Sequence, residues 1–464
     1  MAIYRALVFI GRNAELRLLG QQYDARGSTL VPIYGRRRVG KSELVLRFLQ
    51  DKRAIYYVGK TAPAGLQMRE FLEQAALVLG EPLLKTMPAH GWREIFEEVL
   101  KRKGPGKLVL ALDEFQWMAG ASPELPSVLQ ELWDRHARIP EALMIILCGS
   151  YVGFMEREVL GKKSPLFGRR TAQILLKPFT YREAAGFHPG WSLTDRATTY
   201  FLCGGIPFYL RFFDVHRSVE TNIEHVILDE LGPLFREPDF LLREELREVE
   251  SYYAVLLAIA EGNATQKTIG IRSGLPERNL PYYLQQLVDL GYVARRYPLS
   301  EQKAAARHVR FVLIDPLLRF WFRFVFPNMS FLQQMGPTRT MRRIRSELAA
   351  YYGACFEHVC REALPYLYER EGIDAAFEVG EFWNKEVQID VVGLRSDNWT
   401  DLGECKWGAI RSPAQALAEL EGKAASYPNR RNATLGLRLF THRTIKAPVS
   451  RRPLRVHDLE ALYR

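Results

Sequence analysis

Eight residues, Gly35 to Ser42 (GRRRVGKS), have the spacing G-x-x-x-x-G-K-[S/T] of a phosphate-binding loop. Its glycines allow successive backbone N–H groups to turn towards a triphosphate, and the N-terminus of a following helix adds partial positive charge. Lys41 would reach the β- and γ-phosphates of ATP, and the Ser42 hydroxyl would ligate Mg²⁺. The predicted ATP-binding residues of the loop are Gly35, Arg36, Arg37, Arg38, Val39, Gly40, Lys41 and Ser42.

The segments on either side of this loop match what it requires. Leu30 to Tyr34 (LVPIY) is strand-like, and Glu43 to Leu49 (ELVLRFL) repeats its apolar residues at helical spacing. A simple glycine turn is the alternative interpretation of the eight residues. The strand before them and the helix after them favour a nucleotide site.

A pair of carboxylates follows a second apolar run. Lys107 to Leu112 (KLVLAL) predicts a strand, and Asp113 and Glu114 come directly after it, as in a Walker B motif. We expect Asp113 to hold Mg²⁺ through water and Glu114 to polarise the attacking water as general base. The next strand leads to Ser150. A small polar residue there lies beside the γ-phosphate in many additional-strand ATPases, although a strand-end turn would also explain it.

Strand-like runs alternate with helical segments over this part of the chain, which predicts a parallel sheet with helices on both faces. The runs after the loop are residues 53–58, 107–112, 142–148 and 171–176.

Composition limits the class of protein. A chain of 464 residues is too long for one ordinary core, so several domains are expected. Residues 142–155 form the longest uncharged stretch, too short to span a bilayer, and the N-terminus lacks a signal-length apolar core. The five cysteines form no CxxC pair, so the sequence suggests neither a zinc knuckle nor a disulfide framework. We therefore expect a cytoplasmic protein without a membrane partner. The net charge of +11 is compatible with a nucleic-acid partner, but it is equally compatible with a soluble basic protein that has no such partner.

The ordered set of motifs resembles the archaeal-type prokaryotic ATPases of the wider AAA-like superfamily. The matching segments are FIGR with Glu15-Leu16 (9–16), GRRRVGKS, LALDEFQW (110–117), ILCGS (146–150), PLFGRR (165–170) and GGIPFYL (204–210). The resemblance implies that Phe9 to Glu15, with Arg12, lie near the adenine. It also implies that Arg169 or Arg170 approaches the nucleotide and stabilises γ-phosphate charge, in cis or across a subunit contact. A surface basic pair before a strand is the alternative for these two arginines.

The middle of the chain predicts two helical modules. Residues 179–240 read as a helical lid over the nucleotide. Between 241 and 332, three helices and two strands predict a winged helix, with Pro281 tolerated in the first turn of the third helix. That third helix has little basic character, so base readout of DNA is poorly supported and an internal regulatory domain is the alternative. Phosphate contact would come from the wing residues Arg295, Arg296, Lys303, Arg307 and Arg310.

A second candidate site lies near the C-terminus, after a turn-rich basic segment, residues 336–345, that predicts a linker. A helix over 346–363 would carry Glu357. Residues 386–392 and 400–407 would pair as an antiparallel hairpin. Glu404 and Lys406, two apart, would share a sheet face, and the register could bring Asp390 beside them. Such a group suits metal-assisted phosphodiester cleavage, with Asp390, Glu404 and Glu357 binding Mg²⁺ or Mn²⁺ and Lys406 activating water.

These residues resemble the PD-(D/E)xK nuclease superfamily, especially the domain of unknown function appended to archaeal-type ATPases. The superfamily proline before the aspartate is absent, since Ile389 stands there. A solvated hairpin with a salt-bridged Glu–Lys pair, or a nuclease-like fold that no longer cleaves, are the alternatives. Lys423 in the following helix could contact a phosphate or nothing.

The sequence as a whole predicts a multidomain α/β protein. The expected parts are a P-loop ATPase core with a parallel sheet (1–178), the helical lid (179–240), the winged helix (241–332) and an α/β nuclease-like, restriction-endonuclease-like domain (333–464). ATP state would control metal-dependent binding or cleavage of nucleic acid, DNA being the expected partner. The alternative function is a nucleotide-gated switch or scaffold that does not cleave, with a homo-oligomer or protein partner left open.

Overall fold

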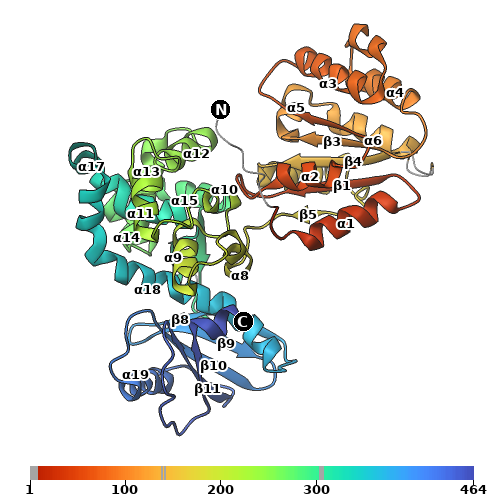
Figure 1. Cartoon of the computed structure of the whole chain (residues 1–464). Coiled ribbons are helices and arrows are strands. Elements are labelled where there is room, and N and C mark those ends of the chain that lie inside the picture. Colours follow the sequence, from red (N-terminus) through yellow and green to blue (C-terminus); the bar gives the residue numbers. More distant parts are fainter. Residues whose placement is uncertain (1–8, 137–138, 140–142, 303–307) are drawn as a thin grey trace. The chain divides into compact units, whose positions relative to one another are not determined.

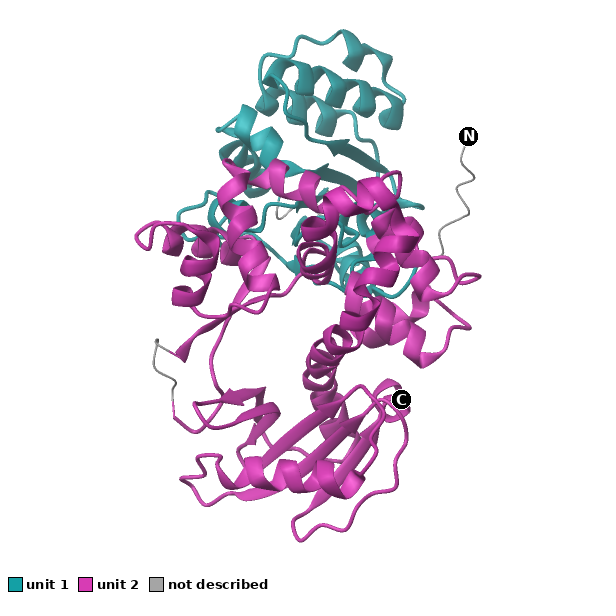
Figure 2. Cartoon of the chain, turned by 90° about the vertical axis from the view of Figure 1, so that its left-hand side faces the viewer, with its two compact units in different colours: residues 1–178, 206–208 teal, residues 179–205, 209–464 magenta. Residues whose placement is uncertain are grey.

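The computed structural model describes residues 9–136, 139, 143–302 and 308–464. Its chain divides into two compact units (Figure 2), and each is described by itself. Residues 1–178 and 206–208 belong to the first unit, and residues 179–205 and 209–464 belong to the second. The division into four domains stays a prediction.

The first unit contains a five-stranded sheet in the order β2-β3-β4-β1-β5, and each neighbouring pair is parallel (Figure 1). Its strands are β1 (Thr29–Tyr34), β2 (Ala54–Val58), β3 (Leu108–Asp113), β4 (Leu143–Gly149) and β5 (Ile174–Leu175). Every residue of β1, β3 and β4 is buried. The predicted parallel α/β sheet is confirmed.

Helices cover this sheet because alternate strand residues face opposite layers. Leu108, Leu110 and Leu112 of β3 join one core with Phe71, Trp92 and other residues of α3 to α6. The helices of the unit are α1 (Asn13–Asp24), α2 (Lys41–Leu49), α3 (Ala64–Leu79), η1 (Pro82–Thr86), α4 (Trp92–Lys101), α5 (Phe115–Ala121), α6 (Leu125–His136), α7 (Val152–Phe154) and η2 (Met155–Val159).

The second unit begins with mostly short helices, as predicted for the lid segment. They are α8 (Tyr181–Ala184), η3 (Ala185–Phe187), α9 (Leu193–Cys203), α10 (Pro207–Leu210, whose first two residues belong to the first unit), α11 (Val219–Asn222), η4 (Ile223–Leu228) and α12 (Glu237–Glu245).

Three helices and a two-stranded antiparallel sheet follow in the predicted order. They are α13 (Val249–Ala260), α14 (Gln266–Ser273), α15 (Leu280–Asp289), β6 (Val293–Arg296) and β7 (Arg310–Leu313). Pro281 lies in the first turn of α15, where its missing N–H costs no hydrogen bond. An aromatic helical segment comes next: α16 (Pro316–Phe320), η6 (Trp321–Val325), η7 (Phe326–Asn328) and α17 (Met329–Met335).

The linker predicted for residues 336–345 is wrong. Gly336, with φ at 77°, ends α17, and the single long helix α18 (Pro337–Arg370) starts directly after it (Figure 1). Met341, Ile344 and Leu348 are buried at helical spacing, so an apolar stripe holds this basic segment in the helix. The predicted helix over 346–363 is therefore the middle of a longer one.

A mixed sheet completes the second unit in the order β12-β11-β10-β9-β8. Its elements are β8 (Phe377–Trp383), β9 (Gln388–Arg395), β10 (Trp399–Lys406), α19 (Pro413–Ala425), β11 (Thr434–Thr441), β12 (Leu454–Asp458) and the last helix α20 (Leu459–Tyr463). β9 and β10 pair antiparallel, which confirms the predicted hairpin, whereas β10 and β11 pair parallel. Among the described residues, no helix combines the length and the apolar character needed to cross a membrane.

Candidate functional site

The predicted phosphate-binding loop joins the end of β1 to the start of α2. A side chain at Gly35 would come within 2.3 Å of the carbonyl oxygen of Leu176, so only glycine fits there. Gly40, the residue before α2, has φ at 89°, and Arg38 also has positive φ, at 68°. This backbone turns the loop onto the N-terminus of α2, where unpaired N–H groups favour an anion.

Lys41 is buried at the start of α2. Its ammonium donates hydrogen bonds to the carbonyl oxygens of Gly35 and Arg36, both at 2.9 Å. Burial lowers the pKa of Lys41, and the neighbouring thiol of Cys148 and carboxylates of Glu114 and Asp113 oppose that shift. The two carbonyl oxygens hold the Lys41 ammonium inside the loop.

Ser42 and Asp113, predicted to share a magnesium ion, lie side by side. The Ser42 hydroxyl donates to Oδ2 of Asp113 at 2.6 Å, although the two residues are 71 positions apart in the chain. Hydroxyl and carboxylate oxygens, completed by water and phosphate oxygens, make the donor set that Mg²⁺ prefers. These two residues could hold the magnesium of an ATP complex.

Tyr56 of β2 is a third member of this group and was not predicted. Its hydroxyl donates to the same Oδ2 of Asp113 at 2.6 Å. Burial and the Asp113 carboxylate raise the pKa of Tyr56, so the phenol stays protonated and keeps donating. No contiguous motif marks Tyr56, because it reaches Asp113 only through the parallel pairing of β2 with β3.

Glu114, the predicted general base, is held by two polar side chains. The Ser150 hydroxyl donates to its Oε2 at 2.7 Å, and the amide of Gln116 donates to the same oxygen and, at 3.1 Å, to Ser150. Glu114 has a left-handed backbone, with φ at 48°, at the N-terminal end of α5. Such strained residues concentrate at functional sites. Gln116 was not singled out from the sequence, although it lies within the quoted LALDEFQW motif.

The three arginines predicted to lie near the nucleotide, Arg12, Arg169 and Arg170, make different kinds of contact. Arg12 donates to the carbonyl oxygens of Lys177 at 2.7 Å and Val39 at 3.3 Å, so it ties the N-terminal segment to the loop. Arg169 makes a bidentate ion pair with Asp134, at 2.8 and 2.9 Å. Arg170 acts on Tyr34, the residue before the loop, by opposing the burial-driven rise of its pKa.

Residues 206–208 bring a distant segment to the loop. They belong to the first unit, whereas the chain on both sides belongs to the second. The guanidinium carbon of Arg38 lies 4.1 Å from the centre of the Phe208 ring. Pro207 lies 3.7 Å from the point where a side chain at Gly40 would begin. The GGIPFYL motif therefore contacts the phosphate-binding loop.

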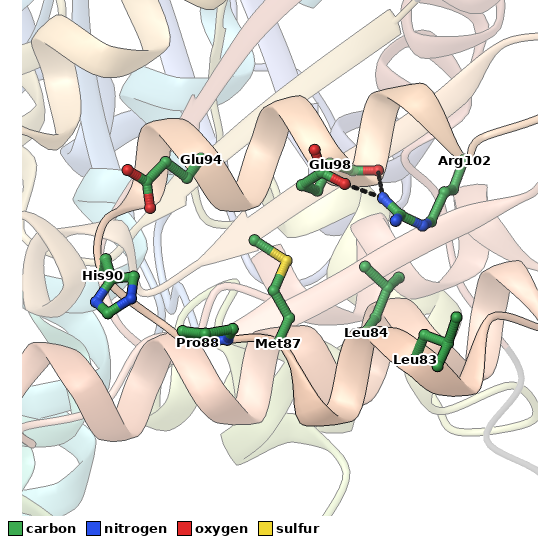
Figure 3. Close-up of a pocket in the computed structure, with 8 residues that line it drawn as sticks. All are labelled: Leu83, Leu84, Met87, Pro88, His90, Glu94, Glu98 and Arg102. Atoms are coloured by element: carbon green, nitrogen blue, oxygen red, sulfur yellow. Dashed lines mark hydrogen bonds and ion pairs between the residues drawn. The ribbon is translucent and has the colours of Figure 1, made fainter.

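A separate groove of about 370 Å³ lies between η1 and α4 (Figure 3). It is lined by Leu83, Leu84, Met87, Pro88, His90, Glu94, Glu98 and Arg102. None of these is a predicted nucleotide-binding residue, so the groove is not part of the ATP site.

In the second unit, Asp390 and Glu404 lie on paired strands. Oδ2 of Asp390 accepts the backbone N–H of Cys405 at 2.9 Å, which places it next to Glu404, as the register argument expected. Glu404 is buried, and its two carboxylate oxygens accept from Lys406 at 3.0 Å and from Lys423 at 2.5 Å. The contact of Lys423, left open by the sequence, is therefore with this carboxylate.

Glu357 of α18 approaches the same pair of carboxylates. Burial and the charge of Asp390 raise the pKa of Glu357 to about 7. Burial and the charge of Glu404 raise the pKa of Asp390 to about 6. Arg361 lies 3.7 Å from Glu357 and donates to the carbonyl oxygen of Asp390 at 2.6 Å. The predicted carboxylates therefore act on one another electrostatically, with the partly buried Arg361 beside them.

This arrangement does not fit a metal centre as it stands. Among the described residues, no group of three or more His, Cys, Asp and Glu side chains is placed to hold a metal ion. Both oxygens of Glu404 bind lysines, and Asp390 binds a backbone N–H. Metal ligation by Asp390, Glu404 and Glu357 stays a prediction, and the observed partners are those of an ion-pair cluster.

The described basic residues of the predicted wing contact protein groups. Arg296 pairs with Glu381 of β8 at 3.0 Å. Arg310 lies 4.4 Å from the Trp383 ring and donates to Gln388 at 3.1 Å. Arg295 donates to Gln285 of α15, whereas Lys303 and Arg307 lie outside the described residues. Two of the predicted phosphate-contacting residues are therefore engaged with the C-terminal sheet.

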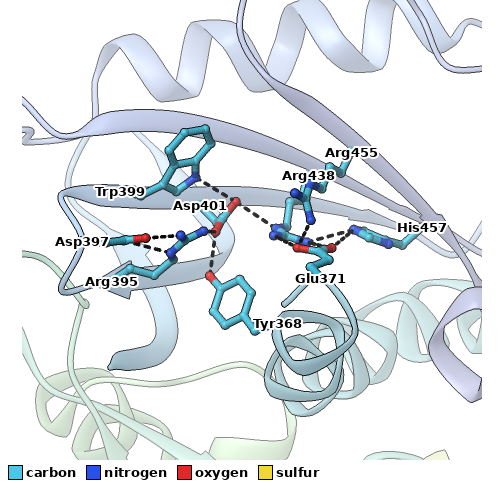
Figure 4. A network of polar contacts seen from close by, with 9 residues as sticks. All are labelled: Tyr368, Glu371, Arg395, Asp397, Trp399, Asp401, Arg438, Arg455 and His457. Atoms are coloured by element: carbon cyan, nitrogen blue, oxygen red, sulfur yellow. Dashed lines mark hydrogen bonds and ion pairs between the residues drawn. The ribbon is translucent and has the colours of Figure 1, made fainter. Parts of the chain in front are cut away.

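A buried polar network joins the end of α18 to β10, β11 and β12 (Figure 4). Arg438, only 1% exposed, donates to Asp401 at 2.9 Å and to both oxygens of Glu371 at 2.8 and 2.7 Å. The Tyr368 hydroxyl donates to the other oxygen of Asp401 at 2.7 Å. This network fixes the sheet on α18 and was not predicted.

Comparison with known proteins gives matches in both units. Residues 9–212 match a family described as an ATPase domain predominantly from Archaea, and residues 321–417 match one described as "Archaea bacterial proteins of unknown function". An uncharacterised protein of Methanocaldococcus jannaschii is 30% identical over 411 residues, covering 87% of this chain and 88% of that protein.

Two further similarities concern the ATPase part. An uncharacterised ATP-binding protein of the same organism is 37% identical over 51 residues, which are 11% of this chain and 86% of that protein. Among solved structures, a Walker-type ATPase of Pyrococcus abyssi has a TM-score of 0.51 at 21% identity. The alignment covers 68% of this chain and 96% of that one, and it supports the fold alone.

Proposed function

We infer the function from one premise: the chain belongs to the same family as its M. jannaschii relative, and its N-terminal half is an ATPase domain of the type found predominantly in Archaea. We propose that it binds and hydrolyses ATP, and that nucleotide state switches a C-terminal domain that binds a partner without cutting it.

The contact between Ser42 and Asp113 carries the ATPase proposal. Their oxygens meet at 2.6 Å beside the buried ammonium of Lys41, so phosphate and magnesium ligands converge at one point. Bound Mg²⁺ would neutralise charge on the β- and γ-phosphates. In our proposal Glu114 orients and deprotonates the attacking water, and Ser150 with Gln116 fixes the direction of its carboxylate.

Residues 206–208 support the switch. Because this segment contacts the phosphate-binding loop and continues into the second unit on both sides, a change of the loop would move chain that both units share. We propose that Arg38 and Phe208 pass the nucleotide state to the helices that flank this segment.

Two variants test the ATPase proposal through separate steps. We expect Lys41→Ala to lose ATP binding and turnover, and Glu114→Gln to bind ATP but release phosphate at least about a hundredfold more slowly, the scale of general-base catalysis. Binding is measured by titration with a fluorescent ATP analogue and turnover by phosphate release. Wild-type turnover in Lys41→Ala would reject the proposed site.

Nuclease activity of the C-terminal domain is a second candidate function. It is favoured by the convergence of Asp390 and Glu404 on paired strands and by the order α18, β8, β9, β10, α19, β11. The lysine partners of Glu404 favour the binding module instead, because both of its oxygens are already engaged.

Cleavage assays separate the two candidates. The intact chain is incubated with linear and circular DNA in Mg²⁺ or Mn²⁺, beside Asp390→Ala and Lys406→Ala. Cleavage that both variants lose would establish the nuclease. Equal DNA cleavage by all three proteins, or cleavage by none of them, would favour a C-terminal domain that binds its partner without cutting it.

A further inference from the structure

The beginning of α18 presents a basic surface to solvent. Its residues 337–346 include four arginines and no carboxylate. Arg339, Arg342, Arg343 and Arg345 are all exposed, whereas Met341, Ile344 and Leu348 on the opposite side are buried. The buried stripe fixes the rotation of the helix, so these arginines are held outwards.

Three of these arginines form one continuous face. Arg339, Arg342 and Arg343 are spaced i, i+3 and i+4 and therefore lie on the same side of the helix. In the described part of the chain none of the three has an ion-pair partner, whereas Arg345 pairs with Glu220. We call Arg339, Arg342 and Arg343 the arginine face.

Neighbouring side chains pack against this face without neutralising it. The Arg343 guanidinium lies 4.7 Å from the centre of the Phe331 ring of α17, and Arg339 donates to the sulfur of Met335 at 3.1 Å. Surfaces that bind nucleic acid combine positive charge along the backbone path with aromatic side chains and arginines. The N-terminus of α18 adds partial positive charge at the same end.

The wing offers a smaller basic surface in its described residues. The charge of Arg296 is balanced by Glu381, and only Arg295 and Arg310 have uncharged partners, Gln285 for the first and Gln388 and Trp383 for the second. The three charges of the arginine face are not balanced by a carboxylate in the described part of the chain, so an external anion can bind there. We propose that the arginine face binds the phosphate backbone of a nucleic acid.

Two physical arguments select this partner. A membrane-surface helix needs an apolar face to insert, but the apolar side of α18 is already buried in the protein. Arginines about one turn apart along a rigid helix, about 5.4 Å, suit a polymer that carries negative charge at short regular intervals.

The continuity of α18 places the arginine face near the C-terminal cluster. Arg342 and Glu357 are 15 residues apart on one helix, which corresponds to about 22 Å. That is less than one turn of duplex DNA, about 34 Å. A duplex held on the arginine face and running along α18 would therefore extend past the Asp390–Glu404 cluster, whether or not that cluster cleaves it.

The test is the salt dependence of duplex binding by the intact chain. Anisotropy of a labelled 20-base-pair DNA is titrated at several salt concentrations with wild type and the triple variant Arg339→Gln, Arg342→Gln, Arg343→Gln. Each lost phosphate contact lowers the slope of log affinity against log salt by about 0.9, so we expect a decrease of about 2 to 3. At about 0.1 M salt we expect at least a roughly tenfold loss of affinity.

Arg345→Gln is the matched control, since it removes an arginine of the same helix that is already paired. We expect it to change the slope by less than about one. Equal slopes for wild type and the triple variant, or no duplex binding by wild type, would overturn the proposal. So would loss of binding to phosphatidylserine vesicles with duplex binding unchanged. ATP turnover, measured in the same proteins, should be the same in all and reports separately on the proposed ATPase.

Discussion

At the scale of single residues, the ATPase site depends on side chains that meet from separate strands. Asp113 accepts hydrogen bonds from Ser42 of the loop and from Tyr56 of β2 at the same oxygen. The two donors fix the carboxylate from two directions. Tyr56 is therefore a positioning residue for the group expected to hold magnesium through water.

Removing the Tyr56 hydroxyl should weaken the apparent affinity for Mg²⁺ in ATP turnover without disturbing the fold. We predict that Tyr56→Phe raises the Mg²⁺ concentration needed for half-maximal ATP turnover by about tenfold, since a hydrogen bond to a charged group contributes about 1.5–3 kcal/mol. The measurement is phosphate release at varied Mg²⁺. Tyr57→Phe is the control, because the hydroxyl of Tyr57 contacts Glu70 instead. A shift of the same size in both variants would argue against a role for Tyr56.

The residues that the sequence identified and those it missed differ in one respect. Lys41 and Ser42 belong to a contiguous motif, and Glu114 follows a strand directly, so local spacing was sufficient. Tyr56 reaches the site only through the pairing of β2 with β3. Gln116 reaches it only through the turn at Glu114. Contacts of this kind require the tertiary structure.

At the scale of elements, the charge pattern of residues 336–345 was misleading. Four arginines and a Gly-Pro pair are typical of a linker, but the burial of Met341 and Ile344 holds the segment in α18. For the wing, the sequence predicted the secondary structure but not the contacts of its arginines. Its elements were predicted, whereas the partners of Arg296 and Arg310 lie in strands about 80 residues further along the chain.

The contact between the wing and β8 should stabilise the second unit. Arg296 and Glu381 are both largely buried, so removing Arg296 leaves Glu381 with only a longer ion pair, to Arg361 at 3.9 Å. We predict that Arg296→Met lowers the free energy of unfolding by about 2 kcal/mol, below the 3–5 kcal/mol of fully buried pairs. Urea unfolding measures the change. Arg295→Met, a neighbour that contacts Gln285 on the surface, should cost less than about 0.5 kcal/mol. Equal losses would mean that the ion pair is not the cause.

The network around Arg438 predicts a loss of stability in acid. Burial, with Arg438 and Arg455 nearby, lowers the pKa of His457 from 6.5 to about 3. The unfolded chain therefore binds a proton that the folded chain does not, and stability is lost as pH falls below 6.5. Between pH 7.5 and 5 this histidine should cost about 2 kcal/mol.

His457→Gln isolates this contribution, because its amide oxygen can still accept from Arg438. We expect the variant to lose about 2 kcal/mol less than wild type over that pH range in urea unfolding. Substitution of the exposed His216 by Gln is the control and should leave the pH dependence unchanged. Parallel pH profiles for wild type and His457→Gln would exclude the effect.

At the scale of the whole molecule, the chain path suggests how two units can share one signal. Residues 206–208 belong to the ATPase unit, but α9 before them and the rest of α10 after them belong to the second unit. The proposed switch uses this path: a rearrangement of the phosphate-binding loop would act on residues 206–208, which lead into the second unit in both directions. The GGIPFYL motif was part of the sequence resemblance, yet only the structure places Phe208 against Arg38.

We predict that Phe208→Ala separates ATP binding from the response of the second unit. Hydrogen exchange of the intact chain, with and without a non-hydrolysable ATP analogue, should report nucleotide-dependent protection of α9 and α12 in wild type. In Phe208→Ala that difference should fall at least about twofold while the affinity for the analogue changes less than about threefold, because the ring packs on Arg38, whereas Lys41 and Ser42 have other partners. Phe212→Ala, four residues further along and flanked by Arg211 in a similar way, is the control. If Phe208→Ala keeps the full nucleotide-dependent protection, the signal must pass through another part of the chain.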